Sequence, residues 1–86
     1  MIQMEALEAY TRQNRPESYA DKLIYDRMVR LTLNWMDSHK IKEPKVFLAQ
    51  EGKEYDAMID FLEEKLKTKV EIDPELFKLM WAVRQP

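Results

Sequence analysis

The stretch that decides the fold is PESYADKLIYDRMVRLTLNWMDS, residues 16–38. Within it, apolar side chains recur at steps of three and four residues, which is the spacing of one helical face. This first stripe consists of Ala20, Ile24, Met28, Leu31 and Trp35, and a second stripe beside it of Tyr25, Val29, Leu33 and Met36. At ~100° per residue the two stripes cover a little over half of the circumference. The segment therefore predicts a long helix that either packs on two sides or offers one side to a partner.

Local signals on both sides of this segment set its boundaries. Residues 1–12 have a weak helical stripe that ends before Asn14-Arg15-Pro16-Glu17. Proline disfavours helix in the residue before it and is tolerated in a first turn. Asn14 and Glu17 have the spacing of a capping box, so we expect the long helix to begin at Pro16.

Residues 45–50 are ambiguous, because a run of four apolar residues fits a short helix or a strand equally well. We favour the short helix, since Pro44 suits a helix start and Gly52 suits a helix end. Residues 53–67 have a narrow apolar stripe typical of a surface helix, and residues 70–72 are expected to be an extended linker. Asp73-Pro74-Glu75 then predicts the start of a last helix that reaches residue 83. From Leu76 onward this helix is apolar except at Lys78.

These elements predict an all-α fold, a compact bundle of three or four helices in a single domain that spans residues 1–86. The alternative is an α+β fold in which residues 46–48 and 70–72 pair as two short strands. The last helix is so apolar that we expect it to lie partly in the core and partly in an interface.

Composition excludes several classes of protein. The 86 residues include no cysteine, one histidine and one glycine, which excludes disulfides, multi-histidine metal centres and glycine-rich phosphate loops. No segment has the ~18 consecutive apolar residues of a membrane span. The first ten residues carry Glu5 and Glu8 and no basic residue, unlike a signal peptide. We therefore expect a cytoplasmic protein without membrane contact.

Residues suited to catalysis are scarce. His39 follows Ser38 directly, but adjacency in sequence does not supply the geometry of a catalytic pair, and we expect a solvent-facing histidine near a helix end. Asp56, Asp60 and Glu63 form an acidic row, which we interpret as a solvated helix face rather than a metal site. The sequence thus predicts no enzyme, no cofactor and no bound metal.

Charge is unevenly distributed along the chain. Residues 12–45 hold eight basic and five acidic side chains, whereas residues 51–75 hold four basic and nine acidic ones. The net charge of −2 is unlike that of a typical nucleic-acid module. The basic half still offers five candidate contacts to nucleic acid or to the rim of a protein interface, namely Arg27, Arg30, Lys40, Lys42 and Lys45.

Aromatic residues and methionine carry the strongest functional signal, because these side chains are enriched at the cores of interfaces. We therefore predict a non-enzymatic interaction protein, such as a small accessory protein, an inhibitor or an assembly subunit. It would bind a partner protein or a second copy of itself, and a nucleic-acid partner is the alternative. The predicted contacts are Tyr25, Val29, Leu33, Met36, Phe77, Met80 and Trp81.

Overall fold

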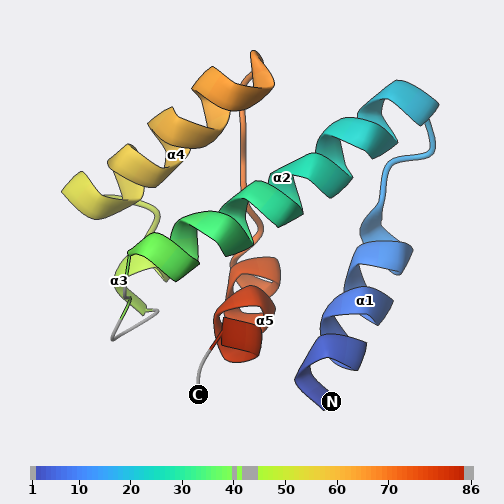
Figure 1. Ribbon diagram of the computed structural model, residues 1–86, viewed down its shortest axis with the longest axis horizontal. Coiled ribbons are helices and arrows are strands. Elements are labelled where there is room, and N and C mark those ends of the chain that lie inside the picture. Colours follow the sequence, from blue (N-terminus) through green and yellow to red (C-terminus); the bar gives the residue numbers. More distant parts are fainter. Residues whose placement is uncertain (1, 40, 42–44, 85–86) are drawn as a thin grey trace.

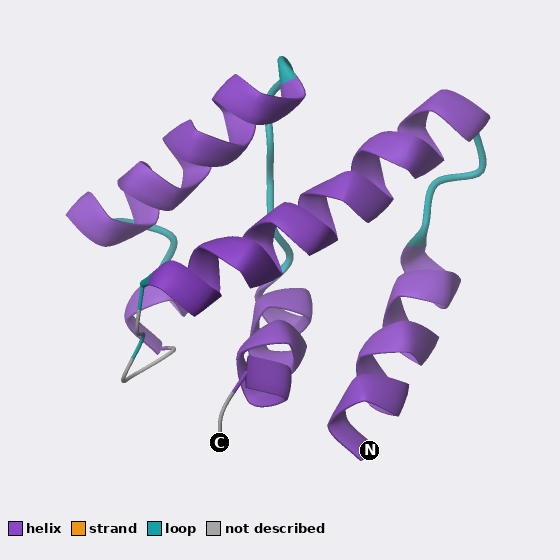
Figure 2. Cartoon of the chain, viewed as in Figure 1, coloured by secondary structure: helices purple, strands orange, loops and turns teal. Residues whose placement is uncertain are grey.

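Helices make up most of the described chain. The computed structural model of the protein describes residues 2–39, 41 and 45–84. Its helices are α1 (Ile2–Asn14), α2 (Tyr19–Ser38), α3 (Lys45–Leu48), α4 (Lys53–Leu66) and α5 (Pro74–Arg84). These described ranges contain no strand (Figure 2), so the predicted all-α bundle is confirmed and the alternative pairing of 46–48 with 70–72 is wrong. No helix in them is both long and apolar enough to cross a membrane.

The long helix α2 crosses the molecule and packs on two sides, against α4 and α5 (Figure 1). Helix α5 has more neighbours still, since it packs against α1, α2 and α3. The Cα radius of gyration is 12.4 Å, close to the ~12 Å expected for a folded chain of this length. The apolar surplus of α5 is thus largely covered by this chain's own helices.

The start of α2 differs from the predicted one. The helix begins at Tyr19 rather than Pro16, and Ser18 is its N-cap, whose hydroxyl accepts from the Asp21 backbone N–H at 3.5 Å. The predicted capping box of Asn14 and Glu17 is wrong, because Asn14 is the last residue of α1 and its side-chain amide donates to the Tyr10 carbonyl. Ser18 is suited to this position because its short side chain reaches the free N–H groups of the first turn.

Gly52 lies in the turn between α3 and α4 but does not have its predicted role at the end of α3. Lys45–Leu48 is a short helix as predicted, while Pro44 lies outside the described residues. Gly52 does not end α3. It precedes α4 with φ 107° and ψ 164°, a backbone region that is almost restricted to glycine. Helix α3 is instead followed by Gln50, which has a positive φ and donates from its side-chain amide to the Ile72 carbonyl at 3.0 Å.

Two substitutions test the backbone at the ends of α4. We expect Gly52→Ala to lower the free energy of unfolding by about 1–3 kcal/mol, although a Cβ there meets no neighbouring atom, because the strain lies in the backbone itself. Lys67 ends α4 in the left-handed conformation with φ 59°, so Lys67→Gly should raise stability by up to about 1 kcal/mol. Urea unfolding measures the free energy of unfolding of both variants, which should change in opposite directions. A loss of stability in Lys67→Gly would contradict this prediction.

The core lies where α2, α4 and α5 meet, and α1, α3 and the 67–73 linker each add one residue to it. Its only buried polar side chain among the described residues is Thr32, whose hydroxyl donates to the Met28 carbonyl at 2.7 Å and is thereby satisfied. The buried apolar residues are Leu7, Met28, Trp35, Met36, Phe47, Met58, Leu62, Ile72, Leu76, Phe77 and Met80.

An aromatic cluster centred on Phe47 fastens the short helix α3 to the bundle. The Phe47 ring stacks on Phe77 of α5 with centroids 5.2 Å apart. It also meets Trp35 of α2 and Tyr55 of α4 edge-to-face, at 6.0 Å and 6.4 Å. One side chain of a four-residue helix thus contacts three other helices, and such aromatic pairs add to the stability gained by burial.

The segment between α4 and α5 is an extended linker, as predicted, and polar contacts hold it in place. The Val70 backbone N–H donates to the Glu63 carboxylate at 3.0 Å. At the start of α5, the Asp73 carboxylate accepts from the Glu75 backbone N–H at 3.4 Å, and the Asp73 carbonyl accepts from Phe77 at 2.9 Å. These contacts confirm Asp73 as the residue that caps the last helix.

Candidate functional site

The exposed large apolar side chains gather on the first half of α2. Among the described residues, four such side chains are exposed, and three of them lie within six positions of one helix. Tyr19 is 74% exposed, Leu23 51% and Ile24 39%, whereas the fourth, Met4 on α1, is 37% exposed. All four buried residues of α2 lie at or after Met28, the tenth of its 20 residues. Before Met28 no residue of α2 is buried, and Ile24 and Tyr25 line a cleft together with Leu66 at the end of α4.

Two arginines extend this apolar surface along the same side of the helix. At ~100° per residue, Tyr19, Leu23, Arg27 and Arg30 fall within about 80° of one another. We call these four residues the α2 outer face. Both arginines are exposed, and neither forms an ion pair with another described residue. The face thus combines an aromatic ring, a branched aliphatic side chain and two arginines that form no ion pair with a described residue.

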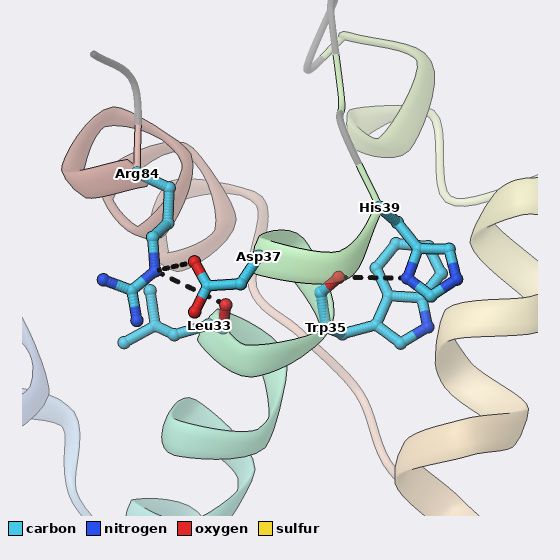
Figure 3. A network of polar contacts seen from close by, with 5 residues as sticks. All are labelled: Leu33, Trp35, Asp37, His39 and Arg84. Carbon is cyan, nitrogen blue, oxygen red and sulfur yellow. Dashed lines mark hydrogen bonds and ion pairs between the residues drawn. The ribbon is translucent and has the colours of Figure 1, made fainter.

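Two other arginines of the protein, Arg15 and Arg84, serve the fold. Arg15 pairs with Asp26 at 3.0 Å and so ties the segment after α1 to α2. Arg84 reaches from the end of α5 to the last turns of α2, where it donates to the Asp37 carboxylate at 2.9 Å and to the Leu33 carbonyl at 3.4 Å (Figure 3). Arg27 and Arg30 differ from these two residues in having no such role among the described contacts.

Three of the predicted partner contacts are core residues. Met36 is 6% exposed, Phe77 3% and Met80 0%. The prediction took their apolar character for a free surface, but α1, α2 and α3 pack around α5 and cover it. These three side chains cannot touch a partner while the chain is folded as described.

The other four predicted contacts are half-buried and pack against the core. They are Tyr25, Val29, Leu33 and Trp81. The Trp81 indole N–H donates to the Ile41 carbonyl at 2.9 Å, so its polar atom is already used within the chain. Burial raises the pKa of Tyr25 above its usual value of 10.0, and the negative charge of Asp26 adds to this rise. These residues form the edge of the core rather than a free apolar patch.

The predicted basic contacts are placed only in part. Arg27 and Arg30 are exposed on α2, and Lys45 is exposed at the start of α3. Lys40 and Lys42 lie outside the described residues.

A cleft of about 590 Å³ between the second half of α2 and α4 contains the single histidine. The His39 ring stacks on Trp35 with centroids 4.0 Å apart, and its Nδ1 lies 3.1 Å from the Trp35 carbonyl (Figure 3). A carbonyl only accepts hydrogen bonds, so Nδ1 carries the proton and donates. His39 thus caps the end of α2, as expected of a histidine near a helix C-terminus.

This cleft does not assemble a catalytic pair from the described residues. Ser38 and His39 both line it, but no hydrogen bond joins the Ser38 hydroxyl to the imidazole. Residues missed by the sequence analysis also line the cleft, among them Phe61 and Lys53 of α4. Phe61 and Lys53 are far from Trp35 in sequence, so no local pattern predicted that they would line the same cleft.

The acidic row on α4 is split between two roles. Asp56 and Asp60 are exposed, whereas Glu63 is half-buried and accepts the Val70 N–H described above. Within the described part of the chain, no group of three or more acidic or histidine side chains converges where a metal ion could bind.

No family model, no curated protein and no solved structure matches the chain.

Proposed function

We propose that the protein is a non-enzymatic interaction module that binds a partner protein through the α2 outer face. The observation that carries the proposal is the exposure of Tyr19 and Leu23 next to two unpaired arginines on one helix side. Such a module would act as an accessory protein, an inhibitor or an assembly subunit. We also propose that the protein is cytoplasmic. The partner is either another protein or a second copy of this chain.

The chemistry of the α2 outer face supports this function. Tyrosine and arginine are among the residues that contribute most to binding energy at protein interfaces. Leu23 lies between Tyr19 and Arg27 at four-residue steps, so an apolar centre is flanked by an aromatic ring and a positive charge. Rim arginines of this kind steer acidic partners and fix the register of docking. A partner that supplies apolar and acidic side chains would complement this face.

The double variant Tyr19→Ala with Leu23→Ala tests the proposal. Both side chains are largely exposed, so we expect the change in the free energy of unfolding to stay within about 0.5 kcal/mol for each. Binding should fall by more than tenfold, because truncation of two central contact residues commonly costs over 1 kcal/mol each. The measurement is quantitative mass spectrometry of proteins captured from source-cell extract by tagged wild type and variant.

Met4→Ala is the matched control, since Met4 is an exposed apolar residue of α1 outside this face. It should retain every protein that wild type captures. If the double variant keeps the same captured proteins as wild type, the proposed site is wrong.

A nucleic-acid partner is the second candidate, favoured by the exposed and unpaired Arg27 and Arg30. Phosphate contacts of this kind make affinity fall steeply with salt. The discriminating treatment is nuclease before capture. Partners that survive nuclease and depend on Leu23 favour the protein interface, whereas partners lost on nuclease and on Arg27→Glu favour nucleic acid.

A further inference from the structure

We propose that the cleft between α2 and α4 binds a free aromatic amino acid in its zwitterionic form. The cleft holds about 590 Å³, which lies within the ~300–1,000 Å³ of sites that take small molecules. None of the four residues of the α2 outer face lines it, so this inference goes beyond the proposed function. The aromatic rings and the two charged side chains of the cleft name the ligand.

The aromatic part of the cleft suits a flat ring. Trp35 and His39 of α2 lie one over the other, 7° from parallel, on the side of the helix that faces α4 (Figure 3). The Trp35 carbonyl accepts from His39 Nδ1 at 3.1 Å and so fixes the imidazole in place. Phe61 lines the cleft from α4, and Ala57 of the same helix adds only a methyl group, which leaves room for a ligand. Aromatic rings gain stability from stacked and edge-to-face contacts beyond that of burial alone.

The charged part of the cleft suits a zwitterion. Lys53 and Glu54 are adjacent at the start of α4, and both are exposed and line the cleft. Neither forms an ion pair with another described residue. An α-amino acid carries its ammonium and its carboxylate on one carbon, so it can pair with both side chains at once. A ligand with a single charge would be attracted by one of them and repelled by the other.

The first test is an NMR titration of the ¹⁵N-labelled protein with L-phenylalanine. The chain has two tryptophans, and their indole N–H signals serve as site and control. Trp35 lines the cleft, whereas Trp81 does not and donates to the Ile41 carbonyl. The Trp35 signal should shift saturably with a dissociation constant of ~1 mM or below, as expected for a ligand of this size, while the Trp81 signal stays in place. No saturable shift of the Trp35 signal at about ten times that concentration overturns the proposal.

Analogues of phenylalanine test which of its groups are recognised. Phenethylamine lacks the carboxylate and 3-phenylpropionate lacks the ammonium, so each should bind about two- to fivefold more weakly, the range expected for one exposed ion pair. Alanine lacks the ring and should not bind. N-acetylphenylalanine amide lacks both charges and represents a phenylalanine within a peptide. If it binds as tightly as phenylalanine, the zwitterion is not what the cleft recognises and the proposal is wrong.

Variants of α4 test the two charges in the protein. Lys53→Gln and Glu54→Gln change exposed side chains, so the fold should be kept while each raises the dissociation constant for phenylalanine about two- to fivefold. Asp60→Asn is the matched control, because Asp60 is an exposed acidic residue of α4 that does not line the cleft. Ala57→Trp should fill the cleft and abolish the Trp35 shift, with circular dichroism to confirm folding. Binding that is unchanged in both charge variants contradicts the proposal.

Discussion

Replacing Phe47 with alanine should lower the free energy of unfolding by about 3–5 kcal/mol, which is a large part of the stability of a chain this small. The side chain is 3% exposed and contacts aromatic rings from α2, α4 and α5. Its removal leaves a cavity where three helices meet, and α3 has no other buried residue among those described. Urea unfolding followed by circular dichroism measures the loss.

Lys45→Ala is the control for this prediction, because Lys45 belongs to the same short helix but is exposed. Its effect should stay within about 0.5 kcal/mol. A Phe47→Ala variant as stable as Lys45→Ala would mean that α3 is not fastened to the bundle by this ring. The aromatic cluster would then not be the contact that joins α3 to α5.

Met80→Ala should cost about 2–5 kcal/mol of stability, since Met80 is 0% exposed and packed within the core. Tyr19→Ala should leave the free energy of unfolding nearly unchanged, although tyrosine is the larger residue, because Tyr19 is 74% exposed. The two variants thus compare a buried side chain of α5 with an exposed side chain of α2. Thermal or urea unfolding of both variants measures the difference.

Lys78→Ala supplies the matched control on α5. Lys78 is exposed and its ion pair with Glu75 is a surface contact of 3.8 Å, so little stability should be lost. A Met80→Ala variant that unfolds like wild type but loses a partner would restore the prediction that α5 is an interface.

Local signals in the sequence predicted the elements well. The start of α5 at Pro74 follows directly from Asp73 as predicted, whereas Pro16 does not begin α2 and Gly52 does not end α3. The start of α2 was displaced by three residues because two capping signals compete there. Ser18 and Asp21 also have the spacing of a helix cap, and in the structure the Ser18 hydroxyl accepts from the Asp21 N–H. Asn14 does not cap α2, because it is the last residue of α1.

Burial could not be predicted in the same way, because an apolar stripe does not say which element will cover it. Met36, Phe77 and Met80 looked like surplus apolar surface on two helices. In the structure all three side chains are buried. Met36 lies on α2, Phe77 and Met80 lie on α5, and α5 packs against α1, α2 and α3. That arrangement depends on contacts far apart in the chain, such as the stacking of Phe47 on Phe77.

The apolar residues of the α2 outer face, Tyr19 and Leu23, were missed for a related reason, whereas Arg27 and Arg30 were predicted as candidate contacts. The stripe through Ala20 and Ile24 was expected to continue the core, but both residues are exposed. Periodicity continues along the whole helix, whereas its buried residues begin only at Met28. An apolar stripe alone does not indicate where along a helix burial begins.

The central proposal is that the α2 outer face, rather than another exposed helix surface, contacts the partner. A photo-activated crosslinking residue at position 23, and in parallel at positions 4 and 60, tests it most directly in source-cell extract. The account predicts a covalent product from position 23, with another protein or a second copy, and none from the exposed positions 4 and 60. A product from position 60 or 4 without one from position 23 would contradict it.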